Sequence, residues 1–154
     1  MTYTARILTF TAIVFGTLIS SDMSAYGNEA DAMKVYLWKN RPLVLFAPSP
    51  DSPVYRSVPD ALSTSSGKIS NRHMVVIEVF EDHMVQTNGK PDSRFDAAAL
   101  RQRFSVEKGD LTVVLIGKDG GVKLRQSGRL HLDEIFSTID RMPMRRQEMK
   151  ESGE

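Results

Sequence analysis

The sequence predicts one α/β domain in which a mixed sheet of four strands carries helices on both faces. Two apolar runs, residues 43–46 and 74–80, are separated by a helical segment, which is typical of a parallel β-α-β unit with a right-handed crossover. Residues 117–121 carry a strong hairpin signal, and a hairpin joins antiparallel strands. Residues 132–142 have the clearest amphipathic helical pattern. A length of 154 residues suits one domain.

The first half of this pattern predicts a helix, a strand and a second helix. Residues 30–39 have an imperfect apolar helical face, and Arg41-Pro42 interrupts it before the strand at 43–46. Three prolines make residues 47–53 a loop. A helix is then expected from about residue 54 to residue 69, with a kink at Pro59 as an alternative, and its serine-rich end has low helix propensity.

The middle of the chain contains the best candidate for a central strand. Residues 74–80 are apolar and rich in β-branched side chains. Residues 81–93 contain Asn88-Gly89 and Pro91, which predict a loop or a short excursion from the sheet. A helix is expected at 94–104, where alanine, leucine and phenylalanine share one face.

The last part of the domain predicts a hairpin followed by a helix. The strands are residues 112–116 and 122–126, and the second alternates apolar and polar side chains as an edge strand does. The helix at 132–142 has acidic residues near its start and ends before Pro143. Residues 144–154 are highly charged and are expected to be frayed. The order of elements is therefore βαβ-α-ββ-α.

Composition excludes several classes of function. The chain has 20 Lys+Arg and 19 Asp+Glu, a net charge of +1, so nothing in its bulk charge indicates a nucleic acid partner. It contains no cysteine, which excludes disulfides, thiol catalysis, iron–sulfur clusters and a lipidated cysteine. The sequence indicates no cofactor and no metal site, and no phosphate-binding glycine loop is present, because a strand follows Asp119-Gly120-Gly121.

The start of the chain has the pattern of a signal peptide. Residues 7–19 are apolar and uncharged, Arg6 precedes them, and the polar run 20–22 follows. This apolar run is too short to span a bilayer comfortably. Small residues favour cleavage before Asn28, so we expect a periplasmic or secreted protein with no stable membrane span after cleavage.

The predicted signal peptide and the charged C-terminal end divide the chain into three parts. They are a signal peptide at 1–27, a folded domain at 28–143 and a charged C-terminal tail at 144–154. The alternatives are cleavage after Ala25, an uncleaved membrane anchor, and a true start at Met23.

The strand ends resemble those of thioredoxins. Leu45-Phe46-Ala47-Pro48 is similar to the thioredoxin strand that ends in Phe-Trp-Ala-Pro before the redox loop. Residues 112–120 resemble the thioredoxin strand and hairpin that follow the cis-proline. The resemblance implies a thioredoxin-like fold. It also places Pro50 and Pro53 at the two redox cysteines and Leu111 at the cis-proline, so thiol–disulfide and peroxidase chemistry are both lost.

A second resemblance covers residues 30–150. The block 38–48, the block 112–125 and the closing segment 139–149 are similar to an uncharacterised bacterial peroxiredoxin-like family. That family is similar to the P-DUDES domain of vertebrate sushi-repeat-containing extracellular proteins. The resemblance implies a thioredoxin-like fold and an extracytoplasmic location, and it implies no established activity.

The loop after the first strand is the first candidate binding site, because ligands of open α/β sheets bind at the carboxyl ends of strands and anions bind helix N-termini. The polar residues there are Ser49, Asp51, Ser52, Tyr55 and Arg56. The competing interpretation is ordinary helix capping by Asp51 or Ser52, with Arg56 in solvent. Asp51 also repels an anion.

The basic C-terminal end is the second candidate. Arg141, Arg145 and Arg146 form a candidate interaction tail for a membrane surface or an acidic partner. The competing interpretation is a solvated face with local ion pairs. A packing role for Met142 and Met144 is a further alternative.

Other titratable residues point less clearly to a site. Glu78 lies inside an apolar strand, and a buried carboxylate there is a site candidate. His73 and His83 stand beside methionines, a pairing that copper sites use, but they bracket one strand and are too far apart to share a metal. No metal site is therefore expected.

Together these observations favour a non-redox, exported thioredoxin-like domain of unknown specific function that serves as a binding or interaction module. Its partner is unknown, and another extracytoplasmic protein is one candidate. The alternative is an enzyme of unknown type that uses a cysteine-free site at residues 49–56, with Asp51, Tyr55 and Arg56 as candidate groups. An inactive redox scaffold that captures the substrates of true oxidoreductases is a variant of the first hypothesis.

Overall fold

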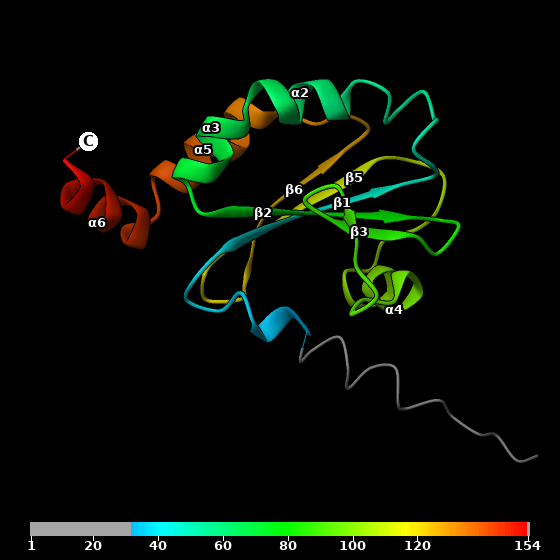
Figure 1. The fold of residues 1–154 in the computed structure, drawn as a ribbon, viewed down its shortest axis with the longest axis horizontal. Coiled ribbons are helices and arrows are strands. Elements are labelled where there is room, and N and C mark those ends of the chain that lie inside the picture. The colour runs from blue at the N-terminus through cyan, green and yellow to red at the C-terminus, as the bar shows by residue number, and fades with distance from the viewer. Residues whose placement is uncertain (1–31, 154) are drawn as a thin grey trace, which may run out of the picture.

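A computed structural model describes residues 32–153. The predicted signal peptide at 1–27 lies outside the described residues. The strands form one sheet in the order β4-β3-β2-β1-β5-β6 (Figure 1). The strands are β1 Arg41–Ala47, β2 Met74–Phe80, β3 Val85–Thr87, β4 Lys90–Pro91, β5 Thr112–Ile116 and β6 Val122–Ser127. The helices are α2 Val58–Thr64, α3 Ser66–Asn71, α4 Ala97–Arg103, α5 Leu132–Asp140 and α6 Pro143–Ser152.

The centre of the sheet has the predicted topology. β1 pairs with β2 in parallel, from Arg41↔Met74 to Ala47↔Phe80. β5 pairs with β1 and with β6, both antiparallel. Pro42 is accommodated inside β1 because the pairing with β5 begins only at Leu43, so the proline has no partner strand on that side.

The sheet has six strands, and the expectation of four was wrong. Residues 85–91, expected to be a loop, form the hairpin β3–β4 on the free edge of β2. Asn88 and Gly89 adopt positive φ angles of 49° and 72°, which two-residue hairpin loops require. The side chain of Asn88 also accepts a hydrogen bond from the Val76 backbone N–H. Pro91 is tolerated because β4 is an edge strand.

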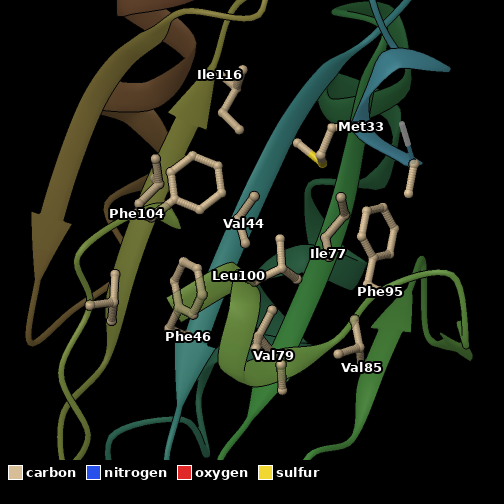
Figure 2. Close-up of a cluster of buried hydrophobic side chains, with 14 of the residues drawn as sticks. Met33, Val44, Phe46, Ile77, Val79, Val85, Phe95, Leu100, Phe104 and Ile116 are labelled. Atoms are coloured by element: carbon tan, nitrogen blue, oxygen red, sulfur yellow. The ribbon is translucent and has the colours of Figure 1, made fainter. Parts of the chain in front are cut away.

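Each face of the sheet carries its own hydrophobic core. α4 and the segment at 32–36 cover one face, where Phe46 and Phe104 pack with ring centroids 6.0 Å apart (Figure 2). α2, α3 and α5 cover the other face (Figure 1). Side chains alternate along β2, so Met74, Val76 and Phe80 join the second core. Glu78 lies on that same face by the same alternation.

Two expected helices and the expected C-terminal tail differ in the structure. The segment at 54–69 becomes two short helices, α2 and α3, which meet at Ser65. Within residues 32–39, only 32–34 are helical and turns follow. The C-terminal segment is not frayed: Pro143 begins α6, which runs to Ser152. In Figure 1, α6 extends from the far end of α5, beside the start of β2.

Candidate functional site

The loop after β1 forms turns and does not gather its polar residues into one site. Ser52 folds back on the loop, where its hydroxyl donates to the Ser49 carbonyl over 2.9 Å. Asp51 and Arg56 are exposed. Neither Asp51 nor Ser52 caps a helix, because α2 begins only at Val58 and has no side-chain cap. Of the five candidates, only Tyr55 meets a functional group from another element.

Tyr55 meets the buried carboxylate of Glu78. Tyr55 is 4% exposed and Glu78 is 7% exposed, and the tyrosine hydroxyl donates a hydrogen bond to Glu78 Oε1. The ring of Tyr55 packs edge-on against Phe80 with centroids 5.1 Å apart. Burial, followed by the hydrogen bond to Glu78 and its charge, raises the pKa of Tyr55 far above its ordinary value. The hydroxyl therefore stays protonated and acts as a donor.

Glu78 also lines a groove between the α2–α3 helices and the β2–β3 edge, which we call the Glu78 groove. It has a volume of about 560 Å³. Its wall consists mainly of aliphatic and small side chains: Pro59, Leu62, Ser63, Ser66, Ile69, Ser70, Met74 and Val76, with Asn88 and Gly89 at the hairpin. Among residues 32–153, no cation pairs with Glu78, and its Oε2 atom has no protein donor. The groove thus presents a buried carboxylate in apolar surroundings.

Arg101 fixes the strand ends near the same loop. This side chain of α4 is 7% exposed and donates to the carbonyls of Ala47 and Glu107, over 3.1 and 3.0 Å. It also reaches the Val79 carbonyl at 3.5 Å and lies over the Phe46 ring. Burial lowers the pKa of Arg101. The residue ties the carboxyl ends of β1 and β2 to α4.

A second cluster of polar residues forms at the opposite end of the sheet, around Glu148 of α6. Arg41, at the start of β1 and 1% exposed, donates two hydrogen bonds to the Glu148 carboxylate, both 3.0 Å long. The Lys118 ammonium group lies 2.8 Å from the same carboxylate and 2.9 Å from His73 Nδ1. Burial favours the neutral acid, but the bonds from Arg41 and Lys118 prevail and lower the pKa of Glu148 to about 2.

The cluster extends to two more arginines. Arg145, 3% exposed, bonds to Asn71 and lies 3.9 Å from Glu148 and 3.6 Å from Asp140. Arg72 pairs with Asp140 over 2.6 Å and covers the Phe136 ring at 4.7 Å. We call this set the Glu148 cluster: Arg41, Arg72, His73, Lys118, Asp140, Arg145 and Glu148.

The Glu148 cluster explains part of the basic C-terminal motif. Arg145 is buried in it, whereas Arg141 and Arg146 are exposed. Met142 packs against the second core, but Met144 is 39% exposed and is not a core residue. Sequence reasoning missed Arg41, Lys118 and Glu148. Their common signal is that each lies in one of the sequence blocks 38–48, 112–125 and 139–149, and the fold brings these three residues together at one end of the sheet.

Residues 32–153 contain neither a membrane-spanning helix nor a cluster of metal ligands. No helix within 32–153 is long and apolar enough to cross a membrane. That same part of the chain contains no group of three or more histidine, aspartate or glutamate side chains placed to hold a metal ion.

Comparison with known proteins agrees with the architecture. The chain is similar in structure to a reduced 2-Cys peroxiredoxin from Plasmodium vivax, with a TM-score of 0.57 and 15% sequence identity. The match covers 75% of this chain and 84% of the peroxiredoxin. At that identity the likeness establishes the thioredoxin-like fold alone. Residues 32–148 match the model of a family described as a domain of unknown function, DUF4174, and the chain belongs to that family.

Proposed function

We propose that this chain is an exported, non-redox binding domain that holds a small amphiphilic molecule in the Glu78 groove. One observation carries the proposal: a carboxylate 7% exposed lines an apolar groove of about 560 Å³ and has a tyrosine hydroxyl as its partner. A buried charge is costly unless it is paired. A ligand with a cationic or hydrogen-bond-donating head supplies the missing partner of Glu78.

The Glu78 groove and the Tyr55–Glu78 hydrogen bond favour binding over catalysis. The aliphatic walls at Leu62, Ile69 and Val76 suit a hydrocarbon chain. The raised pKa of Tyr55 keeps its hydroxyl protonated at neutral pH, so it cannot serve as a base there. A primary amine on an alkyl chain satisfies both parts of the groove, because its ammonium group pairs with Glu78 and its chain covers the walls.

We expect n-octylamine to bind the mature chain at least about tenfold more tightly than n-octanoate, because only the amine pairs with the Glu78 carboxylate. Titration calorimetry at neutral pH measures both affinities. Glu78→Gln removes the charge and keeps the shape, so it should abolish the preference for the amine. Glu107→Gln, an exposed carboxylate outside the groove, is the matched control and should leave the preference intact.

Either of two results contradicts this proposal. One is the absence of saturable binding for both probes, and the other is an amine preference that persists in a folded Glu78→Gln variant. Circular dichroism of each variant establishes that it is folded.

The proposal includes export of the chain by a cleaved signal peptide. The apolar run at 7–19 and the small residues Ala25 and Gly27 support cleavage before Asn28, and the resemblance to the P-DUDES domain of extracellular proteins supports an extracytoplasmic location. Mass spectrometry of the protein from a Gram-negative host should find Asn28 as the first residue of periplasmic material. An intact Met1 in that material contradicts it.

A further inference from the structure

A second cavity lies beside the Glu148 cluster, at the end of the sheet opposite the first loop, and we call it the Lys118 cavity. It has a volume of about 280 Å³. Its lining comes from the start of β1, the β5–β6 hairpin and the start of α6: Arg41, Gly117, Lys118, Asp119, Lys123, Met142, Pro143 and Met144. Three cations and one carboxylate therefore line this cavity. It shares no lining residue with the Glu78 groove.

The charges around the cavity do not balance. Lys123 pairs with Asp119 over 2.6 Å, and both are partly exposed, so they offset one another. Behind them, the Glu148 cluster holds the four cations Arg41, Arg72, Lys118 and Arg145 against the two carboxylates of Asp140 and Glu148. Within this named set the cations outnumber the carboxylates, and buried charge is costly unless it is paired. A bound anion lowers that cost.

The ammonium group of Lys118 has one N–H donor that no protein acceptor within residues 32–153 uses. It is 7% exposed, and its ammonium group carries three N–H donors. Two of them are directed at Glu148 and His73. Since Lys118 also lines the cavity, its third N–H is available to a bound oxygen. Lys123 has donors beyond the one that Asp119 accepts.

The start of α6 adds to the same positive field. This ten-residue helix begins at Pro143, which lines the cavity together with Met142 and Met144. Met142 provides no side-chain cap, and the first turn contains no acidic residue. The positive end of the helix dipole is therefore not offset by its own sequence, which favours an anion there.

From these observations we infer that the Lys118 cavity binds a phosphate dianion, either free or as a small phosphomonoester. Lys118, Lys123 and the first turn of α6 hold its oxygens, and Arg41 contributes charge from behind. The ligand adds negative charge beside the cations of the Glu148 cluster. It thereby ties α6, β1 and the β5–β6 hairpin together.

Phosphorus NMR and titration calorimetry of the mature full-length chain at low ionic strength test this inference. We expect saturable binding of inorganic phosphate and weaker binding of acetate, because acetate carries one charge. Glycerol 3-phosphate separates the two sources: tighter binding than phosphate assigns the cavity to a phosphomonoester, and equal or weaker binding assigns it to free phosphate. No saturable binding of either phosphate species, or tighter binding of acetate, overturns the inference.

Variants that remove a positive or a negative charge from the cavity wall should change phosphate binding in opposite directions. Lys118→Gln should weaken phosphate binding by roughly tenfold, and the more exposed Lys123→Gln by about threefold. Asp119→Asn should strengthen it by about threefold, since it removes the carboxylate that lines the cavity. Lys90→Gln, on exposed β4, is the control and should change nothing.

If Lys118→Gln does not fold, Lys123→Gln and Asp119→Asn decide the question, because both residues are partly exposed and outside the cores. Phosphate binding that is the same in these two variants as in the wild type overturns the site.

Discussion

Glu148→Ala is expected to lower the free energy of unfolding by about 3–5 kcal/mol, because removing one partner leaves buried cations uncompensated. Arg41, 1% exposed, loses both of its 3.0 Å bonds to the carboxylate, and Lys118 loses a contact of 2.8 Å. The loss should also release α6 from β1. Urea denaturation of the mature chain, followed by circular dichroism, measures the effect.

The matched control is Glu151→Ala, a carboxylate on the exposed side of the same helix, with an expected effect within about 0.5 kcal/mol. A pH series separates charge from packing. The pKa of Glu148 is lowered to about 2 in the folded protein, below its ordinary value of 4.5. Its charge therefore stabilises the fold fully above pH 4.5, and that contribution is lost as the pH falls towards 2. The difference between wild type and Glu148→Ala should shrink over that interval. A difference below about 1 kcal/mol at neutral pH contradicts the prediction.

Arg101→Ala is expected to lower the free energy of unfolding by about 3 kcal/mol, since buried carbonyls lose charge-assisted hydrogen bonds. The guanidinium group donates to the Ala47 and Glu107 carbonyls over 3.1 and 3.0 Å and reaches Val79 at 3.5 Å. The Ala47 and Val79 carbonyls lie at or near the carboxyl ends of β1 and β2, and the Glu107 carbonyl lies in the loop between α4 and β5. Thermal and urea unfolding both measure the loss.

Arg103→Ala is the control for the same helix. Its side chain is exposed and lies over the Phe104 ring at 5.4 Å, so only a small loss of stability is expected. Equal effects of the two variants would show that Arg101 contributes by general charge and not through its buried bonds.

The sheet centre was predictable because its signals are local. The run at 74–80 coincides with β2, and the run at 112–116 with β5, since buried strands need continuous apolar residues. The sequence pattern predicts a break at Arg41-Pro42, but β1 begins at Arg41 and is therefore longer than predicted. In the fold, Arg41 is the first residue of the strand, and its guanidinium group donates to Glu148, which lies 107 residues away in the sequence. The Asn88-Gly89 signal predicts a turn but not the hairpin β3–β4, because the two strands have only three and two residues and carry no alternating pattern.

The candidate sites depended on contacts that no local pattern records. Tyr55 and Glu78 were each notable in the sequence, but their hydrogen bond joins the first loop to the third residue from the end of β2. Arg145 looked like part of an exposed basic tail together with Arg141 and Arg146. Its burial follows from the turn at residues 141–142, after which α6 places Arg145 against Asn71 and Asp140.

The sequence by itself determined the absence of cysteine chemistry, the positions of three central strands and the amphipathic helix α5. These follow from composition and from short periodicities, which act within a few residues along the chain. Only the tertiary structure decided which charges are buried and paired. A charged residue looks the same in the sequence whether it faces solvent or a partner, and its environment depends on which distant segments the sheet topology brings together. The Glu78 groove and the Glu148 cluster both arise in that way.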